Sequence, residues 1–175
     1  MATQAEPRPD LRAGRVLAWL PMTIQRLSHI GICVSDLDRS IAFYRDALAF
    51  EVLSSLEVAG PEAEQLLDLE PVALQAVYLE RDGTRIELLH FDEPGETGAP
   101  GPHPINRLGL THLSFRVDDL DAALQAVESN GGQVLKKSRI DNPRFSSGAI
   151  FVSDPDGLRI ELLQAPGDPN VLPGS

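Results

Sequence analysis

Residues 110–121 read LTHLSFRVDDLD, and the chain carries a close copy of this stretch, LSHIGICVSDLD, at residues 27–38. A second phrase also recurs, because DGTRIELL at residues 82–89 returns as DGLRIELL at residues 156–163. Each half of the chain therefore supplies one His and one Glu at matching places, and these are His29 and Glu87 in the first half and His112 and Glu161 in the second. The sequence predicts an internal structural repeat.

The two halves predict the same order of elements. Alternating apolar residues in 25–34 and 110–117 are typical of strands. Asp36 and Asp119 are placed to cap amphipathic helices. Further strands are expected at 50–57, 72–80 and 85–91 in the first half, and at 133–137, 148–152 and 158–164 in the second. We therefore predict an α+β fold, in which two tandem βαβββ modules form a curved, mostly antiparallel sheet funnel.

Composition sets the expected boundaries of these modules. Residues 1–21 read as a flexible N-terminal tail, 22–92 as the first module, 93–106 as a linker rich in Gly and Pro, 107–165 as the second module and 166–175 as a C-terminal tail. Prolines frame an acidic segment at residues 60–71, which predicts a short inserted helix. This insert is either a lid over the funnel or part of the surface.

The charge balance limits the partners. With a net charge of −11 and a pI near 4.7, the chain is not expected to bind nucleic acid or an anionic membrane surface. The single Cys33 excludes an intrachain disulfide and fits a cytoplasmic location. We expect a small-molecule partner, and an anionic substrate would need a local basic pocket.

The repeated His and Glu residues are the candidate chemical site. If the concave faces of the two modules meet, they bring His29, Glu87, His112 and Glu161 to one place. Two neutral imidazoles and two carboxylates form a charge-balanced site for one divalent ion, with nickel, cobalt, zinc, manganese and iron(II) as the candidates. Without a cation, two converging carboxylates would repel each other. Cys33 and Arg116 occupy equivalent places on the two first strands and are candidate substrate contacts.

The motifs HIGICVSDLDRSIAFYRD at residues 29–46 and DPDGLRIEL at residues 154–162 resemble the vicinal oxygen chelate superfamily. This superfamily contains glyoxalase I, methylmalonyl-CoA epimerase, extradiol dioxygenases and bleomycin-resistance proteins, and the resemblance covers about residues 25 to 165. It implies that the metal ligands of the isomerases fall on His29, Glu87, His112 and Glu161. It also implies a homodimer, because members of the superfamily often pair modules across subunits.

The resemblance implies a metal-dependent isomerase or lyase of the glyoxalase and epimerase type. Such an enzyme moves a proton next to a carbonyl through a metal-bound enolate or enediolate, and Glu161 or Glu87 is the candidate base. The alternatives are an extradiol-type iron(II) dioxygenase and a non-enzymatic protein that sequesters a ligand. Three positions depart from the isomerases. Compared with glyoxalase I, Cys33 replaces an Arg that contacts glutathione and Phe91 replaces an Asn. Compared with the epimerase, Gln75 replaces a Glu base, and Gln75 is a candidate substrate contact.

Overall fold

The computed structural model describes residues 23–99 and 101–171, so the predicted N-terminal tail, 1–21, lies outside the described residues. The first module contains β1 (Ile30–Cys33), α1 (Leu37–Asp46), β2 (Glu51–Ala59), α2 (Pro61–Leu67), β3 (Ala73–Arg81) and β4 (Thr84–Glu93). Its strands form one sheet in the order β1-β4-β3-β2. β1 runs parallel to β4 and the other neighbours are antiparallel, so the sheet is mixed.

The second module repeats this plan. It contains β5 (Leu113–Val117), α3 (Leu120–Ser129), β6 (Gln133–Val134), β7 (Ile140–Asn142), β8 (Ser147–Ser153) and β9 (Arg159–Gln164), with 3-10 turns at Lys136–Ser138 and Pro143–Phe145. The strand order is β5-β9-β8-β6, with β7 also paired to β8, and β5 is parallel to β9. The predicted α+β fold of two βαβββ modules is confirmed.

Both helices begin where the sequence predicts. Asp36 caps α1 by accepting a hydrogen bond from the backbone N–H of Arg39 at 2.9 Å, and Asp119 caps α3 through the N–H of Ala122 at 3.0 Å. Each cap satisfies a backbone donor that the first helical turn leaves free. Among the described residues, neither helix nor any other is long and apolar enough to cross a membrane.

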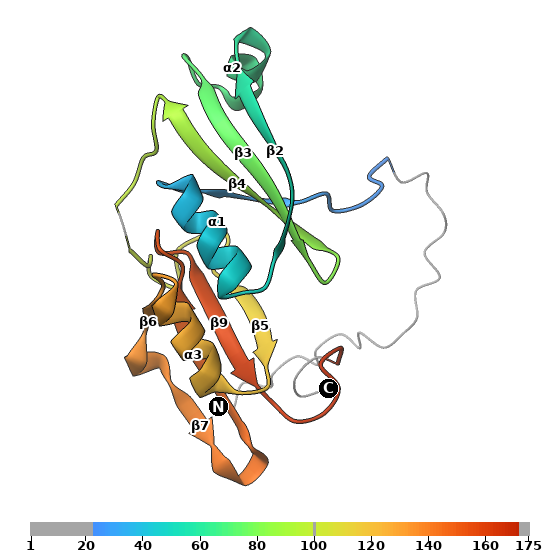
Figure 1. The fold of residues 1–175 in the computed structure, drawn as a ribbon, viewed down its shortest axis with the longest axis vertical. Coiled ribbons are helices and arrows are strands. Elements are labelled where there is room, and N and C mark those ends of the chain that lie inside the picture. The colour runs from blue at the N-terminus through green and yellow to red at the C-terminus, as the bar shows by residue number, and fades with distance from the viewer. Residues whose placement is uncertain (1–22, 100, 172–175) are drawn as a thin grey trace, which may run out of the picture.

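The two modules share one hydrophobic core on the helix-covered faces of their sheets. Figure 1 shows α1 above α3, with the first sheet extending upward to α2 and the second sheet below. Fully buried Phe43 and Tyr44 of α1 belong to the same cluster as Val127 of α3 and Ile160 of β9. The rings of Phe50 and Phe115 meet edge to face with their centroids 6.0 Å apart. The helical sides of the modules therefore pack together.

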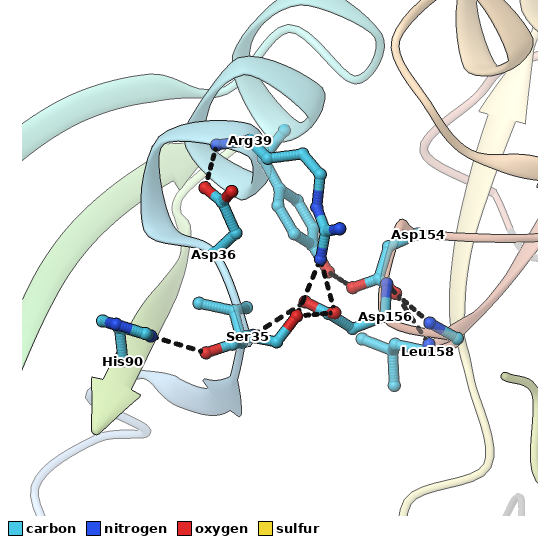
Figure 2. Close-up of polar contacts among 10 residues, drawn as sticks. Ser35, Asp36, Arg39, His90, Asp154, Asp156 and Leu158 are labelled. Carbon is cyan, nitrogen blue, oxygen red and sulfur yellow. Dashed lines mark hydrogen bonds and ion pairs between the residues drawn. The ribbon is translucent and has the colours of Figure 1, made fainter. Parts of the chain in front are cut away.

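A polar contact also joins the modules at the turn between β8 and β9. Asp156 accepts hydrogen bonds from the Ser35 hydroxyl at 2.5 Å and from the Arg39 guanidinium at 2.6 Å, both from the first module (Figure 2). Buried Asp154 accepts three backbone N–H groups from its own turn and the Tyr44 hydroxyl at 3.0 Å. Burial raises the pKa of Asp154 above its ordinary value, although these hydrogen bonds oppose the shift.

The second module departs from the prediction at residues 133–137, where only β6 (Gln133–Val134) remains a strand. The Ser138 hydroxyl accepts the backbone N–H of Phe151 at 2.9 Å, in a place where a regular strand would offer a carbonyl. The chain forms a 3-10 turn at Lys136–Ser138 instead of continuing the strand. After this turn, β7 pairs with β8. The predicted strand is therefore too long.

Candidate metal centre

The first half-site consists of His29 and Glu87. Glu87 lies on β4 in register with Gly31 of β1, and the neighbouring Ile86 and Leu88 are buried against α1. Because side chains alternate along a strand, Glu87 points to the opposite, helix-free face. His29 directly precedes β1, and its Nε2 lies 3.1 Å from Oε2 of Glu87. Its Nδ1 lies 3.2 Å from the Ser28 hydroxyl.

The second half-site consists of His112 and Glu161 at the equivalent places. Glu161 lies on the helix-free face of β9, between the buried Ile160 and Leu162. Nε2 of His112 is 3.8 Å from Oε2 of Glu161, while its Nδ1 lies 2.9 Å from the Thr111 hydroxyl. The Ser114 hydroxyl donates a hydrogen bond to Oε2 of Glu161 at 2.7 Å. Each module therefore sets the His and the Glu of its own repeat side by side.

Sequence reasoning missed two aromatic residues that flank these pairs. Tyr78 lies opposite Glu87 in the sheet, and Phe151 lies opposite Glu161. Each ring packs edge-on against the histidine of its half-site with the centroids 5.3 Å apart. A hydrogen bond to Glu87, with smaller effects of burial and of the carboxylate charge, raises the pKa of the Tyr78 hydroxyl. The repeat could not have found them, because Tyr78 lies nine residues before Glu87 and Phe151 ten residues before Glu161, so their equivalence comes from strand register and not from sequence position.

The two half-sites stay separate within one chain. Among the described residues, which include all four predicted ligands, no three His, Cys, Asp or Glu side chains gather closely enough to hold a metal ion. The cause lies in the packing, because the modules share a core through their helix-covered faces while both pairs lie on the opposite faces. A site that unites all four residues stays a prediction.

A divalent ion requires a definite spacing between the two donor atoms of each half-site. Metal bonds of about 2.0–2.2 Å to an imidazole nitrogen and a carboxylate oxygen place these atoms roughly 3.0–3.4 Å apart. The spacing of 3.1 Å in the first half-site meets this requirement, and the 3.8 Å in the second is slightly too wide. The donor types suit a divalent ion in both. The chain therefore offers two half-sites, of which the second needs a small movement of Glu161.

Cys33 faces a pocket of about 550 Å³ between β1, the linker and the turn that follows β8. Glu96, His103 and Asp156 also line this pocket. Burial raises the pKa of the Cys33 thiol, and the carboxylates of Glu96 and Asp156 raise it further. The thiol is therefore protonated at neutral pH and is not an activated nucleophile.

Arg116 and Gln75 have other partners in this chain. The Arg116 guanidinium donates to the carbonyl oxygens of the C-terminal segment at 2.6–3.3 Å, and these belong to Ala165, Pro166, Gly167, Asp168 and Val171. Gln75 donates to the Asp92 carboxylate at 3.3 and 3.4 Å. Gln75 pairs with His90, three residues from Glu87, so its side chain lies on the opposite face of the sheet. Neither residue is brought together with the predicted metal ligands.

Residues 26–162 match the model of the Glyoxalase/Bleomycin resistance protein/Dioxygenase superfamily. The chain belongs to this superfamily. It is 33% identical over 141 residues to the uncharacterized protein YaeR of Escherichia coli, and this match covers 81% of this chain and 97% of YaeR. It is 32% identical over 142 residues to the lactoylglutathione lyase of Salmonella typhimurium, and that match covers 80% of this chain and 93% of the lyase.

Solved structures of the superfamily share the fold. A glyoxalase family protein from Bacillus cereus superposes with a TM-score of 0.74 at 20% identity, covering 86% of this chain and all of that protein. The fosfomycin resistance protein FosX of Listeria monocytogenes, complexed with Mn(II) and sulfate, gives a TM-score of 0.51 at 17% identity and covers 84% and 98%. Relatives in this superfamily therefore include a protein that binds a divalent metal.

Proposed function

We propose that the protein is a metal-dependent isomerase or lyase of the glyoxalase and epimerase type, which moves a proton on the carbon next to a carbonyl group. The observation that carries this proposal is the His–Glu pair that each module presents on the helix-free face of its sheet. Membership of the superfamily and the similarity to lactoylglutathione lyase add support. Repetition of the pair argues for one shared function of its four residues.

In this proposal His29, Glu87, His112 and Glu161 hold one divalent ion, with nickel, cobalt, zinc, manganese and iron(II) as candidates. When bound, the ion supplies Lewis-acid polarisation of a carbonyl oxygen. The imidazoles are oriented for this role by the hydroxyls of Ser28 and Thr111 at their Nδ1 atoms. Glu161 or Glu87 takes a proton from one carbon position and returns it to another.

The complete site would lie between two copies of the chain, with the first half-site of one copy facing the second half-site of the other. This proposal explains why the pairs lie on open faces while the helix-covered faces are already used within the chain. The edge strand β2 is exposed over nearly its whole length and carries the exposed apolar side chains of Val52, Leu53 and Leu56. These residues are available for the interface of a homodimer.

The proposed substrate is a small carbonyl compound without a glutathione moiety. Cys33 occupies the place of the glutathione-contacting Arg, and its protonated thiol cannot pair with a carboxylate. Phe91 occupies the place of the Asn, and it packs against the small apolar cluster of Ala63, Leu74 and Ala76. This cluster seats α2 over one end of the helix-free face of the first sheet, so the insert limits the space for a long substrate.

The test is exchange of carbon-bound hydrogen in D₂O, followed by proton NMR. The metal-loaded protein is incubated with a panel of small 2-oxo and 2-hydroxy carbonyl compounds, with S-lactoylglutathione as the glutathione-containing comparison. We expect at least one compound of the panel to exchange hydrogen for deuterium at the carbon next to its carbonyl group. This exchange should be lost in Glu87→Gln, in Glu161→Gln or in both variants. No metal-dependent exchange with any compound would contradict the proposal, and oxygen consumption with iron(II) would indicate a dioxygenase.

A further inference from the structure

The two half-sites differ at the residue that lies beside the glutamate on the first strand of each module. In the second half-site this residue is Ser114, which donates a hydrogen bond to Glu161 from the adjacent strand β5. Gly31 holds the equivalent place beside Glu87 on β1 and has no side chain to donate. Tyr78 lies opposite Glu87 on β3, and Phe151 holds the equivalent place opposite Glu161. The serine hydroxyl on the neighbouring first strand is therefore what distinguishes the second half-site from the first.

The two arrangements have different effects on the spacing between His and Glu. Ser114 binds Oε2 of Glu161, the same oxygen that lies nearest Nε2 of His112, and the nitrogen–oxygen distance there is 3.8 Å. With no side chain at Gly31, Oε2 of Glu87 comes to 3.1 Å from Nε2 of His29. The Glu161 side chain is also more exposed, at 29% against 13% for Glu87. Glu87 is therefore held at ligand spacing, and Glu161 is held away from it.

We propose that Ser114 is a positioning residue that draws the Glu161 carboxylate away from His112 and makes it the more weakly held of the two glutamate ligands. This inference rests on the proposed function, because it concerns how the same four residues take up a metal ion. Its physical basis is competition for position, since the hydrogen bond to Ser114 holds Oε2 of Glu161 3.8 Å from Nε2 of His112, and the carboxylate must lengthen this bond to move to ligand spacing.

The first experiment measures the affinity of the full-length protein for Mn²⁺ by competition with a chelating dye. Ser114→Ala removes the competing donor and is expected to tighten Mn²⁺ binding about 3- to 10-fold, whereas Ser114→Thr keeps the hydroxyl and should retain the wild-type affinity. An affinity that falls in Ser114→Ala, or stays within a factor of two of the wild type, would overturn the role assigned to Ser114.

The reciprocal variant is Gly31→Ser, which gives Glu87 the donor that Glu161 already has. A Cβ atom at Gly31 meets only Cδ1 of Leu89, at 3.4 Å, so the substitution fits without strain. We expect it to weaken Mn²⁺ binding, because it draws Glu87 away from His29 in the same manner. Unchanged or tighter binding would contradict the competition between the serine hydroxyl and the metal.

A second readout needs no metal. In the metal-free protein, ¹⁵N NMR of the imidazole rings should show a changed His112 Nε2 signal in Ser114→Ala, as Glu161 moves toward it, with the wild-type signal in Ser114→Thr and His29 unaffected. An unchanged His112 signal in Ser114→Ala would overturn the inference. If wild-type protein binds no Mn²⁺ while the His112 signal moves as expected, the proposed function fails and the positioning by Ser114 stands.

Discussion

The two copies of the hairpin phrase, DGTRIELL and DGLRIELL, fold into equivalent strands with different surroundings at their turns. Asp82 in the first copy is exposed and, among the described residues, pairs with its neighbour Arg81 at 3.2 Å. Asp156 in the second copy is bound by Ser35 and Arg39 of the other module (Figure 2). The repeat therefore gives both modules the same hairpin, while the polar contact between the modules forms at the turn of the second copy.

The largest expected effect concerns the repeat-equivalent glutamates. Replacement of Glu87 by Ala should lower the affinity for Mn²⁺ on the order of 1,000-fold, about 4 kcal/mol, which exceeds the cost of losing an outer hydrogen-bond partner. Glu161→Ala should cost about 100-fold, because Ser114 already competes for this carboxylate. Dye competition measures both affinities. Equal losses would show that the half-sites are equivalent.

Asp154 and Glu80 hold equivalent places before the two turns and should differ strongly in stability. Asp154→Ala leaves the buried Tyr44 hydroxyl and three backbone N–H groups without their acceptor, so we expect a loss of about 3 kcal/mol in the free energy of unfolding. Glu80→Ala removes a partly exposed ion pair with Arg85 and should cost less than about 1 kcal/mol. Urea denaturation measures both, and similar losses would contradict the distinction.

Gly157 and Gly83 provide a comparison in the same turns. Both have positive φ, +102° and +74°, so alanine is strained at each position. A Cβ atom at Gly83 meets open space, whereas at Gly157 it would lie 2.3–2.7 Å from the backbone of Gly101. We expect Gly83→Ala to cost about 1 kcal/mol and Gly157→Ala about 2 kcal/mol or more. Thermal unfolding measures the loss of stability in both variants. A larger loss in Gly83→Ala than in Gly157→Ala would contradict this prediction.

The smallest expected effect is a pH dependence that comes from Asp154. Because its pKa in the folded protein lies above the ordinary value of 3.8, the folded state keeps a proton that the unfolded chain releases as the pH rises through this window. The stability of the wild type relative to Asp154→Asn should therefore be greatest at low pH and fall as the pH rises. Urea titrations at several pH values measure this difference. A difference that grows with pH would contradict the raised pKa.

The sequence predicted what depends on local pattern and on the repeat. The caps at Asp36 and Asp119 and the strands that carry Glu87 and Glu161 follow from periodicities of a few residues, and the structure has them. The structure adds the parallel pairing of β1 with β4 and of β5 with β9, which sets each His beside the Glu of its own module. These features need no knowledge of how the modules pack.

The sequence could not reveal contacts that depend on register and on packing between distant segments. Tyr78 and Phe151 are ordinary strand aromatics until the register sets them opposite Glu87 and Glu161. Gln75 aligns with a base of the epimerases, but its register with His90 turns it to the other face. The hydrogen bonds from Arg116 to the C-terminal segment, and the separation of the half-sites, follow from tertiary packing that has no local signature.

The central claim is that the metal site joins the first half-site of one chain to the second half-site of another. The most direct measurement mixes two inactive proteins, His29→Ala/Glu87→Ala and His112→Ala/Glu161→Ala, after dissociation and reassociation of the chains, and counts bound Mn²⁺. A site between chains leaves one intact set of four ligands in each mixed dimer, so the mixture should recover one ion per mixed dimer while each variant alone binds none. A mixture that stays without metal, although the wild type treated in the same way binds it, would contradict the account.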